Sequence, residues 1–147
     1  MDAFFTKTTP STLVAASESD RELLKKIRTG DTVRVKVTRV RNYEFHKKYF
    51  ALLNFAYDYW EPDNQVGEKC FSQFREDIII LAGYYHRYIR LDNDTRIKAK
   101  SISFGSMPEE EFEKLYTATI DVIIKHICHQ YTGEMLRQTV EMAEGFE

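Results

Sequence analysis

The segment NYEFHKKYFALLNFAYDYWEP, residues 42–62, decides the fold more than any other part of this 147-residue chain. Asn42 suits the first position of a helix, because its short side chain accepts hydrogen bonds from free backbone N–H groups. Apolar residues then recur at the spacing of a helix that buries one side. They are Phe45, Tyr49, Leu52, Leu53, Ala56 and Trp60. Pro62 disfavours a helical residue before it and ends the element.

Outward from this helix, the chain alternates short strands with helices. In Thr32–Val40, three valines alternate with polar residues, which is the period of a half-buried strand. Ser106 to Glu109 has the cap, the early proline and the capping-box glutamate of a helix start. The expected elements are strands at 3–7, 12–16 and 32–40, a hairpin of 85–91 with 96–104, and helices over about 20–28 (capped by Ser17 or Ser19), 42–60, 71–83, 107–131 and 133–143. This order predicts a single α+β domain over residues 1–147, in which long helices pack with small antiparallel sheets and the acidic C-terminal helix is peripheral.

The composition excludes several classes of protein. Hydrophobic residues make up 43% of the chain, with only six Gly and three Pro, which excludes a disordered or collagen-like chain. No apolar run reaches the about 18 residues of a membrane span, and the first residues lack the layout of a signal peptide. Two cysteines, Cys70 and Cys128, cannot form a disulfide framework. We therefore expect a soluble protein of a reducing compartment.

Charge is unevenly distributed along the chain. Residues 21–50 carry ten Lys and Arg against three acids, whereas residues 105–147 carry three against nine. The basic segment favours an anionic partner, and the acidic tail a different role. Alternatively, the two segments pair with each other or are separately solvated.

The densest basic feature runs from Arg34 to Lys48. It starts on a strand face and ends in the first turns of a helix, where free N–H groups suit a phosphate. Aromatic rings lie beside it, and single-stranded nucleic acid needs cations for its phosphates and flat rings for its bases. A second basic row lies on one face of the expected hairpin. The candidate DNA-binding residues are Arg34, Lys36, Arg39, Arg41, Asn42, Tyr43, His46, Lys47, Lys48, Tyr57, Arg96, Lys98 and Lys100.

Each group of these residues has an expected role. The lysines and arginines contact phosphates, Asn42 and His46 hold the backbone by hydrogen bonds, and Tyr43 and Tyr57 stack on bases. Trp60 is assigned to the core. The alternative is that Tyr43, Phe50 and Tyr57 pack on a second element or a second subunit, and that the hairpin row is an ordinary solvated face.

Catalytic and metal motifs are weak. The chain has no glycine-rich phosphate loop and no nucleophile turn, so nucleotide or ester hydrolysis is not expected. His126, Cys128 and His129 lack the paired spacings of a zinc site, and Cys128 fits the core better. Asp58, Glu61 and Asp63 could hold Mg²⁺ as in a nuclease, but they also suit a turn. We expect a protein that is not an enzyme and that binds neither a metal nor a cofactor. The alternative is a metal-dependent nuclease.

Two blocks of sequence carry a family resemblance. They are Val40–Leu53 with Tyr59–Pro62, and Lys100–Met107 with Glu111–Phe112 and Leu115–Tyr116. Together they resemble a family of small, uncharacterised phage and prophage proteins. Their order is also similar, more distantly, to the Orf (NinB) recombination protein family of phage lambda. Arg41, Lys47, Lys48 and Phe50 fall where that pattern has basic and aromatic residues.

The resemblance implies a function. It implies a homodimer that binds single-stranded DNA in the cytoplasm of the host bacterial cell. It also implies a non-enzymatic mediator of recombination, with host single-strand-binding protein or a recombinase as partners. The runner-up is a phage protein that binds and inhibits a host nuclease or defence complex, with the acidic residues 109–113 imitating DNA.

Overall fold

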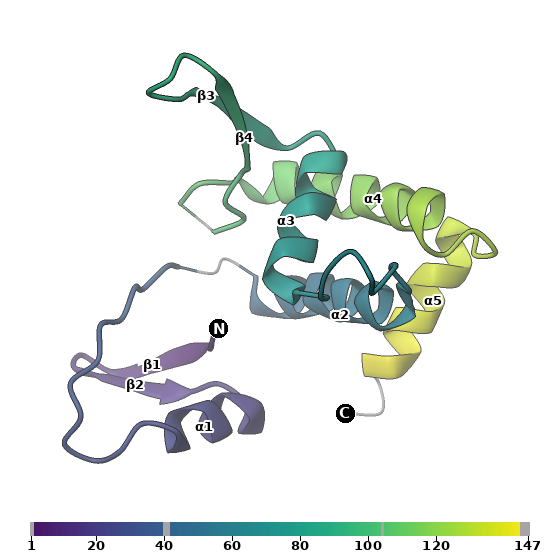
Figure 1. Ribbon diagram of the computed structural model, residues 1–147. Helices are drawn as coiled ribbons and strands as arrows, with labels where there is room; N and C mark the ends of the chain where they lie inside the picture. The colour runs from purple at the N-terminus through teal and green to yellow at the C-terminus, as the bar shows by residue number, and fades with distance from the viewer. Residues whose placement is uncertain (1, 40–41, 104, 145–147) are drawn as a thin grey trace. The chain divides into compact units, whose positions relative to one another are not determined.

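The computed structural model describes residues 2–39, 42–103 and 105–144, and these form five α-helices and two separate two-stranded antiparallel sheets (Figure 1). The α+β class is thereby confirmed. Internal packing divides the chain into two compact units, Met1–Val37 and Thr38–Glu147. The single domain expected over residues 1–147 stays a prediction.

The first unit consists of a hairpin and a short helix. β1 (Phe5–Thr9) pairs antiparallel with β2 (Thr12–Ala15), as the sequence predicts. α1 (Glu18–Lys25) begins after Ser17, whose Oγ accepts a hydrogen bond from the Asp20 N–H at 3.3 Å. The helix thus has one of the two expected caps, but it ends before residue 28.

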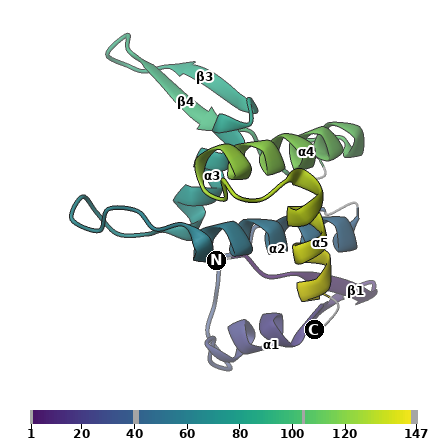
Figure 2. The same ribbon diagram turned by 90° about the vertical axis from the view of Figure 1, so that its right-hand side faces the viewer.

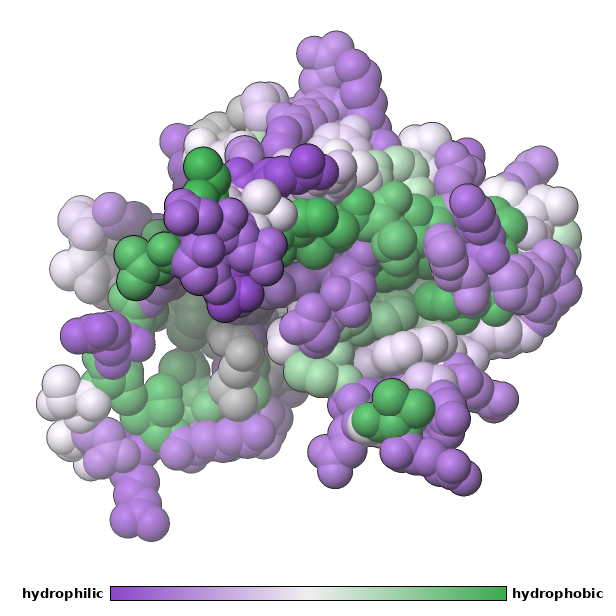
Figure 3. All heavy atoms as spheres, turned by 45° about the horizontal axis from the view of Figure 1, so that its top comes forward, coloured by the Kyte–Doolittle hydropathy of each residue, from purple (hydrophilic) through white to green (hydrophobic). Residues whose placement is uncertain are grey.

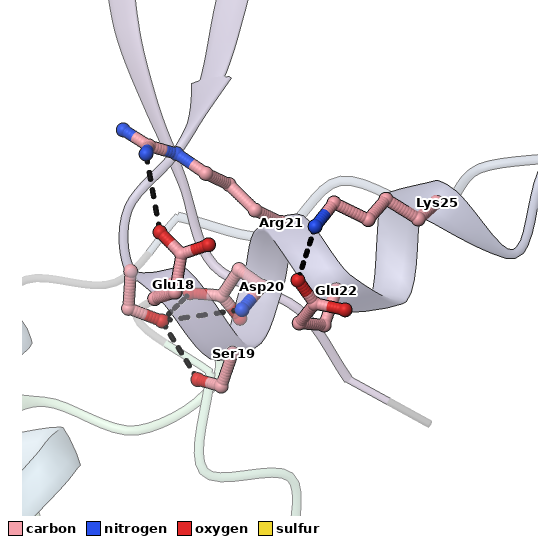
Figure 4. A network of polar contacts seen from close by, with 7 residues as sticks. Glu18, Ser19, Asp20, Arg21, Glu22 and Lys25 are labelled. Carbon is pink, nitrogen blue, oxygen red and sulfur yellow. Dashed lines mark hydrogen bonds and ion pairs between the residues drawn. The ribbon is translucent and has the colours of Figure 1, made fainter.

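Figure 4 shows the polar contacts along α1. Arg21 pairs with Glu18 at 3.1 Å, and Lys25 pairs with Glu22, each three residues apart and solvent-exposed. Pairs of this kind add little stability. Among the described residues of the first unit, Asp20 alone is buried, and it accepts the Phe4 N–H at 3.1 Å. This unit therefore has no apolar core of its own within its described residues.

The prediction of a strand at Thr32–Val40 is wrong for residues 32–39, the part of this segment that the structure describes. Residues 32–39 have no regular secondary structure, and Val33, Val35 and Val37 are 49%, 66% and 72% exposed. An alternating segment becomes a strand only where a neighbouring strand takes its hydrogen bonds. The sheets of the described chain are β1–β2 and β3–β4 alone, and Val40 lies outside the described residues.

α2 (Tyr43–Tyr59) forms as predicted. The Asn42 side chain accepts the Phe45 N–H at 3.0 Å and caps the helix. Along its inner side, Tyr49, Leu52, Leu53 and Ala56 are fully buried. The segment after the helix folds back, so that Nζ of Lys69 donates to the carbonyl oxygens of Tyr57 and Trp60 at 2.5 and 2.9 Å. These bonds satisfy carbonyls that the last turn leaves without helical partners.

The next elements are α3 (Phe71–Leu81) and a second hairpin, β3 (Tyr85–Ile89) with β4 (Thr95–Ala99). Gly83 has a φ of +95°, a conformation that favours glycine, and it lets the chain turn from α3 into β3. At the other end Asn93 has a φ of +64°, and the Arg90 N–H donates to the Asp94 carbonyl at 2.7 Å. Figures 1 and 2 both show this hairpin projecting from the helices of its unit.

α4 (Glu109–His126) and α5 (Gly133–Glu144) complete the second unit. The expected capping box at Ser106 is wrong, because Pro108 occupies the N-cap and no side chain caps the helix. Ser106 is instead engaged with Ser103, through its backbone N–H and through a hydroxyl contact of 3.1 Å. α4 also ends five residues before the expected Tyr131.

The core of the second unit lies between α2, α3, α4 and α5. The buried face of α4 is broad: Leu115, Thr119 and Ile123 are fully buried, Val122 is nearly so, and Ile124 packs against the core. One hydrogen bond crosses this core, between the Tyr49 and Thr119 hydroxyls at 3.1 Å. In the described chain, no helix is both long and apolar enough to cross a membrane.

Candidate nucleic-acid interface

The register of the second hairpin decides which side chains share a face. Tyr85 lies opposite Ala99, His86 opposite Lys98, and Tyr88 opposite Arg96. The Lys100 N–H donates to the Tyr84 carbonyl at 3.0 Å, which extends the same register by one pair. Because directly opposed residues point to the same side of an antiparallel pair, alternate pairs fall on alternate faces.

One face of this hairpin combines rings with cations. We call it the ring-and-cation face, and its residues are Tyr84, His86, Tyr88, Arg96, Lys98 and Lys100. Each of its three pairs places one ring opposite one Lys or Arg; two pairs lie on β3 and β4, and Tyr84 and Lys100 lie just beyond the ends of the strands. The ring centres of His86 and Tyr88 are 6.0 Å apart. The sequence-based prediction that the three bases share one face is confirmed.

The face is anchored at one end and open at the other. Tyr84 and Lys100 are half-buried, and Nζ of Lys100 lies 3.3 Å from a carboxylate oxygen of Glu111 on α4. His86, Arg96 and Lys98 are exposed, and Tyr88 is 52% exposed. Within the described residues, neither Arg96 nor Lys98 has an acidic partner. Two cations and two rings are therefore accessible together.

The basic start of α2 is less open than the sequence suggests. His46 is 9% exposed and stacks between the rings of Phe50 and Phe112, with centres 5.2 and 5.6 Å apart. Nζ of Lys48 lies 2.7 Å from a carboxylate oxygen of Glu141 on α5. Lys47 is exposed.

Several other candidate residues also have structural contacts or belong to the first unit. Asn42 caps α2 through its side-chain oxygen, and Tyr43 is half-buried. Arg39 is exposed, and Arg41 lies outside the described residues. Arg34 and Lys36 are exposed in the first unit. The structure therefore brings together the hairpin residues, and it describes Arg34 and Lys36 in the other unit of the chain.

Tyr57 belongs to an aromatic cluster between α2 and α3. Its ring lies 5.4 Å from those of both Phe71 and Phe74, and Nζ of Lys69 lies 4.3 Å from its centre. Phe50 likewise meets Phe71. The rings of Tyr57 and Phe50 therefore pack on a second element, which is the alternative that the sequence leaves open. Trp60 packs against the core, as expected.

Sequence reasoning missed Tyr84, His86 and Tyr88. The available signal was their alternation along β3, at the same period of two as the bases of β4. The short turn between the strands then brings the two rows to one face. Arg87, also missed, lies on the opposite face.

The described residues contain no cluster of three or more His, Cys, Asp or Glu side chains that could hold a metal ion. Cys128 is buried, and burial raises the pKa of its thiol. Cys70 is exposed at the start of α3, where a hydrogen bond with Ser72 lowers its pKa.

Comparison with known proteins gives one match. No curated protein and no solved structure matches the sequence with significance. A family model described as "Protein of unknown function (DUF1367)" matches residues 2–67 and 63–139, and thus most of both units. The chain belongs to the DUF1367 family.

Proposed function

We propose that this protein is a non-enzymatic, single-stranded DNA-binding protein. The single observation that carries the proposal is the ring-and-cation face of the second hairpin. There Tyr88 lies opposite Arg96 and His86 opposite Lys98, and all four are exposed.

The chemistry of this face suits a single strand better than a duplex. Arg96 and Lys98 supply charge for phosphates, and Tyr88 and His86 supply flat surfaces for bases. Stacking on an aromatic ring contributes about 1–3 kcal/mol per base, and it needs bases that are not already paired and stacked. A duplex offers its phosphates but not its base faces. The rings therefore favour unpaired DNA.

Other candidate residues extend this proposal. Lys47 and Arg39 are exposed in the second unit, and Arg34 and Lys36 are exposed in the first. Lys48 is ion-paired with Glu141, so its contribution to DNA binding requires that pair to open. We assign His46 to the core rather than to DNA, because it is buried between two rings.

The biological setting is also a proposal. The likeness to phage proteins and, more distantly, to the Orf recombination family supports a phage-encoded recombination mediator that acts in the bacterial cytoplasm. In that setting the protein is a homodimer, and its partners are single-strand-binding protein or a recombinase.

Fluorescence anisotropy with labelled single-stranded and duplex oligonucleotides tests the proposal. With about four phosphate contacts, affinity for the single strand falls about 50-fold between 50 and 200 mM salt, from a log–log slope of about −0.7 per contact. The single strand binds more tightly than the duplex. Absence of binding at low salt by the folded protein would refute the function, and cleavage of the DNA with Mg²⁺ or Mn²⁺ would indicate the nuclease instead.

A second candidate rests on the outer side of α4. Glu110, Glu113 and Asp121 line one shallow surface there together with Lys114, so that three exposed acids outnumber one exposed lysine. Such a surface suits a basic partner protein, as in an inhibitor that imitates DNA. Reversing the charges of Glu110 and Glu113, which leaves the Lys100–Glu111 pair in place, abolishes capture of that partner but leaves binding of single-stranded DNA intact.

A further inference from the structure

The two open pairs of the ring-and-cation face repeat at a regular interval along the hairpin. The pairs His86–Lys98 and Tyr88–Arg96 are two residues apart on one face, or about 6.8 Å along the strands. The ring centres of His86 and Tyr88 are 6.0 Å apart, so the rings repeat at nearly the same interval as the cations. This interval is close to the ordinary distance between successive phosphates of a nucleic-acid strand. One pair therefore matches one nucleotide, with the cation for its phosphate and the ring for its base.

A third pair continues the series towards the helices, but its cation is already engaged. Tyr84 and Lys100 stand opposite each other, one step beyond the pair His86–Lys98. Nζ of Lys100 lies 3.3 Å from a carboxylate oxygen of Glu111 on α4, and these two side chains are only 35% and 31% exposed. A phosphate reaches Lys100 only if this partly buried ion pair opens, and it then lies beside the like charge of Glu111. The inner pair is thus closed to a phosphate.

The other end of the face is closed by acidic and apolar side chains of the turn. Asp92 accepts the Asp94 N–H at 3.1 Å and lies 3.5 Å from the Arg90 guanidinium, so a cation near the tip is paired as well. Leu91 is fully exposed in the same turn, and Figure 3 shows hydrophobic patches among hydrophilic side chains on the face that it displays. Carboxylates repel a phosphate, and an aliphatic side chain offers it no partner. The site therefore ends at the outer open pair.

We propose that the ring-and-cation face holds two successive unpaired nucleotides, and that Glu111 sets this length by engaging Lys100. The inference rests on the proposed function and defines the ligand of the same site. One nucleotide lies on each open pair, with its phosphate on the cation and its base against the ring. A third nucleotide finds no free cation at the inner pair, because the carboxylate of Glu111 holds it. Glu111 thus determines specificity for length without contacting the DNA.

Titrations of the full chain with short 5′-phosphorylated thymidine oligonucleotides test the inference, and the backbone amide NMR signals of β3 and β4 report binding at the hairpin itself. The dinucleotide binds about tenfold more tightly than thymidine 5′-monophosphate, because it engages a second ring and a second cation. The trinucleotide binds within about twofold of the dinucleotide, which is the gain that two equivalent registers on the same site provide.

The variant E111Q tests the role of the inner pair. It removes the charge that engages Lys100 and keeps the shape of the side chain. In E111Q the trinucleotide binds about tenfold more tightly than the dinucleotide, because a third nucleotide now has a free cation and the half-buried ring of Tyr84. E113Q is the matched control, since Glu113 is an exposed acid of the same helix, and it behaves like the unmodified chain. K100M/E111Q also lacks the gain, because the released cation is gone.

The outcomes separate the inference from the proposed function. In the unmodified chain, a trinucleotide that gains as much over the dinucleotide as the dinucleotide gains over the monophosphate would overturn the inference and leave the proposed function standing. The same follows if E111Q, with its amide spectrum otherwise preserved, shows no added gain for the trinucleotide, or if K100M/E111Q keeps that gain. Hairpin signals that respond neither to these oligonucleotides nor to a long single strand would overturn the proposed function itself.

Discussion

Nζ of Lys48, in the first turns of α2, lies 2.7 Å from a carboxylate oxygen of Glu141 on α5. The same Nζ lies 5.7 Å from the ring centre of Tyr116. A residue of the basic segment thus pairs with a residue of the acidic tail, which is one of the two readings that the charge distribution leaves open. The pair holds the C-terminal helix against the start of α2, and it ties up a cation that the sequence assigns to DNA.

The pair predicts a pH dependence. The hydrogen bond and the charge of Lys48 lower the pKa of Glu141 below its ordinary value of 4.5. The pair therefore contributes stability above that value, and this contribution is lost as the pH falls through the lowered pKa of the folded state. E141Q unfolds at a slightly lower urea concentration than the unmodified chain at pH 7, and at the same concentration near pH 2.

The control for this comparison is D121N, which removes an exposed acid from the middle of α4, away from the helix ends. It leaves the urea midpoint unchanged at both pH values. A difference between E141Q and the unmodified chain that persists at low pH would show that the substitution acts through something other than the ion pair.

The Tyr49–Thr119 hydrogen bond predicts a second set of changes. Both residues are fully buried, and removing one partner leaves a buried hydroxyl without this bond, at a cost of about 1–3 kcal/mol. Y49F and T119V each lower the free energy of unfolding by this order, and the double variant loses less than their sum. Urea titrations of the four proteins measure the coupling, and strictly additive losses would contradict it.

Burial also raises the pKa of the Tyr49 phenol well above its ordinary value of 10.0. The unfolded chain then releases this proton near pH 10 while the folded chain keeps it, so stability falls as the pH rises above 10. In Y49F this loss is smaller, by up to about 1.4 kcal/mol per pH unit. Urea midpoints measured between pH 8 and pH 11 check the difference, and parallel curves for the two proteins would refute it.

Lys69 predicts a third change. Its ammonium group donates to two carbonyls at the end of α2 and lies 4.3 and 5.6 Å from the ring centres of Tyr57 and Trp60. K69M keeps the aliphatic stem but removes the donor, which costs about 1–3 kcal/mol of stability. Emission shifts as well, because Trp60 is the one tryptophan of the chain. K125M, on the exposed side of α4, leaves both stability and emission unchanged.

Local signals were enough to predict most elements of the fold. The cap at Asn42, the apolar spacing that follows it and the turn residues between β3 and β4 each act within a few residues, and each appears in the structure. The strand at residues 32–40 failed because its hydrogen bonds depend on a neighbour that periodicity does not supply. The predicted cap at Ser106 does not form, because the backbone N–H and the hydroxyl of Ser106 are engaged with Ser103.

The candidate site was harder to predict than the fold. Strand alternation is enough to place Arg96, Lys98 and Lys100 on one face, but the rings opposite them depend on the register between two strands. Burial of His46 and pairing of Lys48 depend on α4 and α5, which are more than sixty residues away in sequence. A basic stretch in sequence therefore does not specify a basic surface, since distant elements decide which cations stay exposed.

The salt dependence of single-stranded DNA binding by the double variant R96A/K98A tests the central claim most directly. K114A/K125A is the matched control, because it removes two exposed lysines from α4. We predict that R96A/K98A weakens binding at 50 mM salt about tenfold or more and reduces the log–log slope by about 1.4, from two lost phosphate contacts, with the thermal midpoint unchanged. The control binds like the unmodified chain. Equal affinity and equal slope for R96A/K98A and the unmodified chain would contradict the assignment of the hairpin as the DNA-binding site.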